Sequence, residues 1–122
     1  MNRPVHFEIP SSDPDKTTKF YSDVFGWKFT QWGSEEYWLA ETGPKHQMGI
    51  DGAVLRRRDP NQPVVNSIEV ADIDATVKVL EAAGGTLVVP KMMVGEMGSL
   101  AYFKDPDGNI FGLWQLANPV LK

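Results

Sequence analysis

The chain has 122 residues, of which 42% are hydrophobic and 23% are charged, and this balance is typical of one globular domain. It contains no cysteine, which excludes a disulfide framework and a thiolate metal site and is compatible with the cytoplasmic location that we expect. The formal net charge is −4 and no apolar run approaches membrane-spanning length, so we expect neither nucleic acid nor a membrane as a partner.

The first half of the chain predicts a strand followed by a helix. Residues 5–9 alternate apolar side chains with the polar His6 and Glu8, which indicates a strand with one apolar and one polar face. Asp13 is placed to cap a helix over residues 14–25, because proline is favoured at the first helical position and a glycine follows the last one.

The second half repeats this order. Residues 67–70 alternate in the same way, with Glu69 in the place of Glu8, and either Asp72 or Asp74 is placed to cap a helix that a Gly-Gly pair ends. Strand-like runs follow both helices, at residues 27–32, 37–41 and 48–55 in the first half and at residues 86–89, 100–104 and 110–116 in the second.

Each half therefore predicts the order β-α-β-β-β. The two copies cover about residues 1–58 and 63–122, and we expect them to form a single α+β domain over residues 1–122. A half of about 60 residues rarely stabilises itself, so the copies should share a core or pair with another chain.

Three short motifs, taken with the tandem repeat, resemble the vicinal oxygen chelate superfamily. They are "FY" in the first helix, "FGW" after it, and "DPDGN" before the last strand. That superfamily includes glyoxalases, bleomycin-resistance proteins and extradiol dioxygenases, and the chain is most similar to the subgroup related to lactoylglutathione lyase. The resemblance implies tandem β-α-β-β-β repeats that form an open, curved, mixed-sheet cavity with the helices outside. It also implies a homodimer.

The metal enzymes of this superfamily place one ligand on each of four strands, and the resemblance implies where those positions fall here. His6 matches the first position, whereas Gly112 stands where a glutamate is usual. The fifth-strand position falls on Ser67 or Val65, and the fourth-strand position has Asp51 as its one strong oxygen ligand. We therefore expect an incomplete metal site and no cofactor, with a divalent metal at His6 and Asp51 as the alternative.

Two glutamates are the candidate catalytic residues. Glu8 and Glu69 occupy equivalent places in the two repeats, and a pair of partly enclosed carboxylates can divide into an acid and a base. The alternative is that both are solvated or paired with lysine or arginine at the rim of the cavity. His6 is either a structural histidine or a residual ligand or general base.

The ligand-binding prediction rests on a glycine beside a tryptophan. Gly112 and Trp114 share one face of a strand, which would leave a slot for a planar or apolar molecule. Residues 90–99 are predicted to be a mobile loop, whose Met92 and Met93 could extend the wall. The complete set of expected ligand-binding residues is His6, Ser67, Gly112, Trp114, Trp38 and Met93.

Three functions are compatible with these residues. The first is a metal-independent protein that binds a small apolar or planar molecule in its cavity. The second is a lyase or isomerase of the lactoylglutathione-lyase type, acting on a carbonyl compound with Glu8 and Glu69 as acid and base or with a rebuilt metal site. The third is an interaction domain with a vestigial cavity, against which the polar strand faces argue, because an abandoned pocket should fill with apolar side chains.

Overall fold

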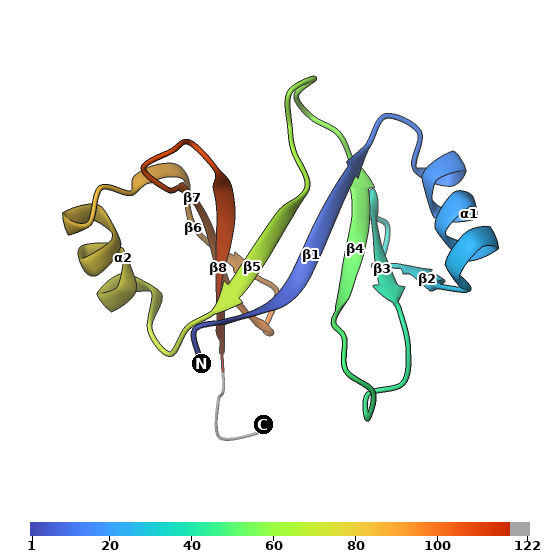
Figure 1. Cartoon of the computed structure of the whole chain (residues 1–122), viewed down its shortest axis with the longest axis horizontal. Helices are drawn as coiled ribbons and strands as arrows, with labels where there is room; N and C mark the ends of the chain where they lie inside the picture. Colours follow the sequence, from blue (N-terminus) through green and yellow to red (C-terminus); the bar gives the residue numbers. More distant parts are fainter. Residues whose placement is uncertain (118–122) are drawn as a thin grey trace. The chain divides into compact units, whose positions relative to one another are not determined.

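The structure is a computed structural model that describes residues 1–117. The chain divides into two compact units, each described by itself (Figure 1). The N-terminal unit is Val5–Val65, and the C-terminal unit comprises Met1–Pro4 and the chain from Asn66 onward. The division at Val65 lies close to the boundary expected between the two repeats.

Ten elements follow the predicted order, and the α+β fold class is confirmed. The first five are β1 (Arg3–Ser11), α1 (Pro14–Phe25), β2 (Lys28–Gln31), β3 (Tyr37–Glu41) and β4 (Asp51–Arg56). The second five are β5 (Val65–Glu69), α2 (Ile73–Ala82), β6 (Thr86–Val94), β7 (Gly98–Lys104) and β8 (Ile110–Leu116). No helix formed by residues 1–117 is long and apolar enough to cross a membrane.

The strand order is the same in both units. The N-terminal unit has the order β2-β3-β4-β1, and the C-terminal unit has the order β6-β7-β8-β5. In each unit the first strand pairs in parallel with the last one, β1 with β4 and β5 with β8, while the remaining pairs are antiparallel. This mixed arrangement makes the two repeats structurally equivalent, so that a residue in one can be matched to a residue in the other.

Both helices begin at the aspartates that the sequence indicated. The side chain of Asp13 accepts a hydrogen bond from the backbone nitrogen of Lys16 at 3.2 Å, and Gly26 ends α1 in the left-handed conformation with φ of 74°. Asp72, and not Asp74, caps α2, because its side chain accepts a hydrogen bond from the backbone nitrogen of Ala75 at 3.2 Å.

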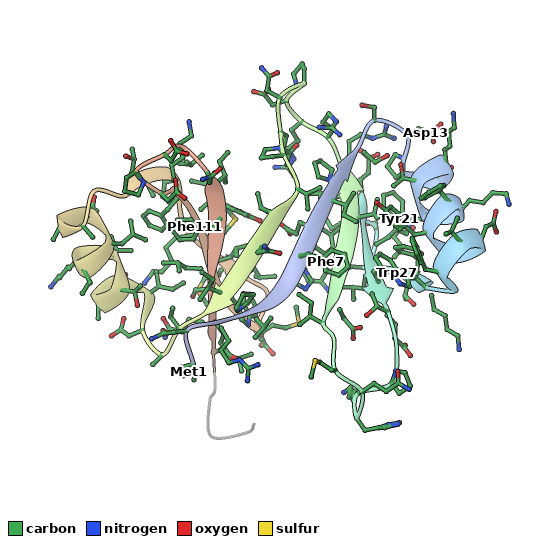
Figure 2. The ribbon with its side chains drawn as sticks, in the orientation of Figure 1. Met1, Phe7, Asp13, Tyr21, Trp27 and Phe111 are labelled. Carbon is green, nitrogen blue, oxygen red and sulfur yellow. The ribbon has the colours of Figure 1, made fainter. Side chains whose placement is uncertain are left out.

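Each helix covers the apolar face of its own strands. In the N-terminal unit, the ring of Trp27 stacks on the ring of Tyr21, with 4.8 Å between the ring centres, and its centre lies 5.5 Å from that of Phe7. These three residues join α1 to β1 (Figure 2). In the C-terminal unit the buried cluster beneath α2 consists of Val70, Ile73, Ala101, Phe103 and Leu113, with Ile68, Val77, Leu80 and Phe111 packed against it. The predicted strand faces are thus confirmed, since Ile68 and Val70 pack on the helix side.

The prediction of a mobile loop over residues 90–99 is wrong. Strand β6 continues to Val94 and β7 begins at Gly98, so this segment is a hairpin with a short turn. A proline is tolerated inside β6 because β6 is the last strand in its unit's order, where a backbone N–H can be absent without breaking a ladder on both sides. The start of β4 is also corrected, from residue 48 to Asp51.

Candidate functional site

The polar face of the N-terminal unit lies on the side of the strands opposite α1. The parallel pairing of β1 with β4 sets His6 beside Asp51 and Glu8 beside Ala53, and the antiparallel pairing of β3 with β4 sets Leu39 beside Ala53. Paired residues share a face and alternate along each strand, so these side chains lie on one face while Phe7 lies on the other.

A tyrosine connects the two polar residues of β1. The hydroxyl of Tyr37 donates a hydrogen bond to Oε2 of Glu8 at 2.7 Å and lies 2.8 Å from Nε2 of His6. The rings of His6 and Tyr37 are nearly parallel, with an angle of 8° between their planes. Glu8 is buried, at 5% exposure, so this carboxylate needs hydrogen-bond partners to be stable there.

The environment of His6 favours its neutral form. Burial lowers the pKa of His6 below its ordinary value, and the nearby carboxylates of Glu8 and Asp51 oppose that change without reversing it. A neutral imidazole can accept a proton from a bound molecule near neutral pH. His6 is therefore suited to act as a general base.

His6 also lines an open groove that belongs wholly to the N-terminal unit. The groove has a volume of about 510 Å³, and the residues that line it include His6, Lys28, Leu39, Glu41, Lys45 and Asp51. This volume is in the range of small-molecule sites, which combine apolar walls with a few polar groups. We refer to it as the N-terminal groove.

Asp51 is placed beside His6 but is held by another residue. Its Oδ1 atom accepts a hydrogen bond from the backbone nitrogen of Thr42 at 2.9 Å and lies 3.2 Å from the hydroxyl of Thr42, which donates to the carbonyl oxygen of Ile50 at 2.7 Å. These contacts join the residue that follows β3 to the start of β4, at the two ends of the segment between these strands. Asp51 therefore has a structural role in addition to any role in the groove.

In the C-terminal unit, four predicted site residues share one face. The register of β5 and β8 sets Ser67 beside Gly112 and Glu69 beside Trp114. A Cβ atom at Gly112 would lie 2.7 Å from the hydroxyl oxygen of Ser67, which is itself 2% exposed. The space that Gly112 leaves is thus taken by Ser67, and the expected slot for a planar molecule is corrected to a packing contact.

The ring of Trp114 lies against a second glycine, on a neighbouring strand. A Cβ atom at Gly98, on the neighbouring strand β7, would lie 2.9 Å from Cη2 and Cζ2 of Trp114. The indole therefore packs against Gly98, where a side chain would also collide with the carbonyl oxygen of Gln115.

Two expected ligand-binding residues lie on the wrong face. Trp38 pairs with Val54, whose own partner on β1 is Ile9, so Trp38 faces the α1 side, opposite His6. Met93 pairs with Ser99 and accepts a hydrogen bond from the hydroxyl of Ser99 at 3.3 Å. Ser99 in turn pairs with Gln115, whose side chain accepts a hydrogen bond from the first backbone nitrogen of α2, so Met93 lies on the helix side.

Tyr37 is the site residue that sequence reasoning missed. The strand over residues 37–41 was predicted, and alternation along it separates Tyr37, Leu39 and Glu41 from Trp38. What the sequence lacks is the register with β4, which decides which of these two sets shares the face of His6. The contact to His6 and Glu8 is made by Tyr37, and not by the expected Trp38.

The strand register pairs His6 with Asp51 in the N-terminal unit and Ser67 with Gly112 in the C-terminal unit. In each unit, two of the positions that the superfamily resemblance implies therefore lie side by side on neighbouring strands. Within residues 1–117, no group of three or more His, Cys, Asp or Glu side chains is arranged to hold a metal ion.

Similarity to known proteins extends over most of the chain. CFP32 of Mycobacterium bovis, whose name proposes that it is a glyoxylase, is 27% identical over 117 residues, which are 92% of this chain and 45% of that protein. The anthracycline biosynthesis protein DauV of a Streptomyces species is 29% identical over 130 residues, covering 92% of this chain and 46% of that protein. The chain thus spans about half the length of these curated relatives.

The crystal structure of methylmalonyl-CoA epimerase from Mycobacterium tuberculosis has the same fold, with a TM-score of 0.69 at 15% identity over 97% of this chain and 90% of the epimerase. The family model of the Glyoxalase/Bleomycin resistance protein/Dioxygenase superfamily matches residues 3–113. With its repeated β-α-β-β-β units and a model match over nearly all of its length, the chain belongs to the Glyoxalase/Bleomycin resistance protein/Dioxygenase superfamily.

Proposed function

We propose that the chain binds a small carbonyl compound in the N-terminal groove and removes a proton from the carbon next to the carbonyl, with His6 as the base and without a metal. The observation that carries this proposal is the hydroxyl of Tyr37, which joins Nε2 of His6 to the buried carboxylate of Glu8. A histidine held in this way resembles the orientation of a catalytic base by a third group.

The proton transfer uses groups that line or support the groove. A ring nitrogen of His6 takes the proton, and the electron pair of the broken C–H bond moves into the carbon–carbon bond of an enolate, so that negative charge collects on the carbonyl oxygen. Return of the proton from His6 to carbon restores the neutral ring. The imidazolium that forms between these two steps is stabilised by Tyr37 and Glu8. Lys28 and Lys45 line the groove, where their positive charges stabilise the negative charge that develops on the carbonyl oxygen.

The named relatives and structural neighbours support this class of substrate. The names of the relatives include glyoxylases, and the epimerases are named for methylmalonyl-CoA, whose labile proton lies between a carboxylate and a thioester carbonyl. Two of the four superfamily metal positions are Ser67 and Gly112, and this donor set supports a reaction that does not use a metal.

The experiment is proton exchange in heavy water, followed by proton NMR. Methylmalonyl-CoA and the methylglyoxal–glutathione hemithioacetal serve as probes, and each is compared with a blank without protein. We expect exchange at the carbon next to the carbonyl for at least one probe, and His6→Ala should lower its rate at least about a hundredfold.

His46→Ala is the matched control, because His46 lies in the exposed segment between β3 and β4 and outside the groove lining. It should exchange at the parent rate. Exchange that is absent for both probes, or that is equal in the parent and in folded His6→Ala, would overturn the proposal.

A second candidate is binding without chemistry, and the apolar part of the groove favours it. Leu39 is 40% exposed and lines the groove with Pro44, which offers a surface to an apolar or planar molecule. Two of the relatives are named for anthracycline biosynthesis, so an anthracycline is a suitable probe. Saturable fluorescence quenching by that probe, lost in Leu39→Lys and accompanied by no proton exchange, would favour this candidate.

A further inference from the structure

We infer that Tyr37 and Glu8 are positioning residues that hold His6 in the tautomer with its proton on Nε2, so that Nδ1 is the nitrogen that acts as the base. The consequence for catalysis rests on the proposed function, whereas the tautomer itself is a property of the free protein and can be tested without a substrate.

The direction of the two hydrogen bonds fixes the proton. A tyrosine hydroxyl has one proton to donate, and Tyr37 donates it to the carboxylate of Glu8 at 2.7 Å. Toward His6, 2.8 Å away, the same oxygen can then only accept a hydrogen bond. Nε2 of His6 must therefore carry a proton, and a neutral ring with a proton on Nε2 has its lone pair on Nδ1.

The location of the three residues makes this arrangement rigid. His6 and Glu8 are two residues apart on β1, so their side chains leave the same face of one strand, and Tyr37 reaches them from β3. The strand between them, β4, presents the small and fully buried Ala53 on this face. Because Nε2 is bonded to Tyr37 while His6 lines the groove, Nδ1 is the ring nitrogen left for a bound molecule.

This arrangement separates the reacting nitrogen from the orienting one. When Nδ1 takes a proton from the substrate carbon, the ring becomes a cation with protons on both nitrogens, and Nε2 keeps its hydrogen bond to Tyr37. The hydroxyl of Tyr37 then lies between this cation and the buried carboxylate of Glu8, whose negative charge stabilises the cation. Glu8 thus acts through Tyr37 and touches no substrate, which differs from the direct acid–base role expected from the sequence.

The test is the tautomer of His6, measured by long-range proton–nitrogen NMR on the full chain labelled with nitrogen-15 in histidine. The chain has two histidines, so exposed His46 provides an internal reference. We expect a single tautomer for His6, protonated on Nε2, together with a directly observable Nε2 proton. In Tyr37→Phe, the exchange of this proton with water should become about tenfold faster, because its acceptor is lost.

Trp38→Phe is the control, because it makes a comparable aromatic change one residue away on the opposite face and should leave the His6 signals as in the parent. A parent spectrum that shows the proton on Nδ1, or a Tyr37→Phe spectrum identical to that of the parent, would overturn the inference. Either result leaves the exchange experiment on methylmalonyl-CoA standing, so the failure of the inference and the failure of the proposed function can be told apart.

Discussion

The hydroxyl oxygen of Ser67 lies 2.7 Å from the point that a Cβ atom at Gly112 would occupy, on the parallel pair of strands β5 and β8. A methyl group and a hydroxyl cannot both fit at that distance. Gly112→Ala should therefore destabilise the fold by about 1–3 kcal/mol, the usual cost of overpacking a well-packed site. Urea denaturation of the purified variant measures this change.

The double variant Ser67→Gly with Gly112→Ala isolates the contact. Removal of the Ser67 hydroxyl should recover most of the stability that Gly112→Ala loses. The difference between the change in unfolding free energy of the double variant and the sum of the two single changes gives the coupling between the two residues. Gly43→Ala is the control, since its nearest neighbour would be 3.8 Å away and the change should fall within about 0.5 kcal/mol. Equal stability of Gly112→Ala and the parent would show that the two strands adjust without strain.

The stability of the protein should depend on pH through His6. Burial lowers the pKa of His6 in the folded chain below the value of 6.5 that applies when the chain is unfolded. As pH falls below that value, the unfolded state takes up a proton before the folded state does, so stability is lost until the pH reaches the folded pKa. Above the unfolded value, the contribution of His6 is constant.

Unfolding free energies measured across pH 5–8 in the parent and in His6→Gln check this sign. The difference between the two curves should rise with pH by at most about 1.4 kcal/mol per pH unit. A difference that falls with pH would mean that the carboxylates of Glu8 and Asp51 outweigh burial.

Divalent metal should be present at well below one ion per chain after extensive dialysis, as measured by elemental analysis for nickel, zinc, manganese and iron. Selective retention of such an ion normally needs three or more protein ligands, and the four superfamily positions offer one imidazole and one carboxylate. That carboxylate, on Asp51, already accepts a hydrogen bond from the backbone nitrogen of Thr42. One ion per chain that disappears in both His6→Ala and Asp51→Ala would contradict this expectation.

We expect the chain to form a homodimer. Strands β2 and β6 each have one unpaired side within their own units, and the β6 strand exposes Leu87 and Met93 at 47% and 67%. Exposed, apolar edge strands are a liability that a second copy can cover. Sedimentation at micromolar concentration should show a species of twice the 13.6 kDa of one chain, and a single-chain species alone would rule the dimer out at that concentration.

Most of the fold could be predicted from the sequence because its signals are local. The cap at Asp13, the left-handed glycine at residue 26 and the alternation along each strand are properties of a few neighbouring residues. These signals located both helices, and the boundaries of β3 and β8 agree with the predicted ranges.

The site was harder to predict because it depends on pairing between distant strands. Alternation shows that Tyr37 and Trp38 point to opposite faces, but only the register with β4 shows that Tyr37 shares the face of His6. Met93 was expected in a loop, whereas it lies in β6, where the pairing with β7 shifts register twice between Leu87 and Met92. The two shifts cancel, so Met93 shares the helix-side face of Leu87.

The parallel pairing of first and last strands has a consequence for the order in which the chain can fold as it leaves the ribosome. Every strand of the N-terminal unit is complete once Arg56 has emerged, so this unit can assemble while the second half is still being made. Strand β5 must wait for its partner β8, which is synthesised last, and the amide of Asn2 donates a hydrogen bond to the carbonyl oxygen of Glu69 at 2.6 Å. The C-terminal unit therefore closes after the N-terminal unit during synthesis, although the parallel pairs of the two units join strands that are equally far apart in the sequence.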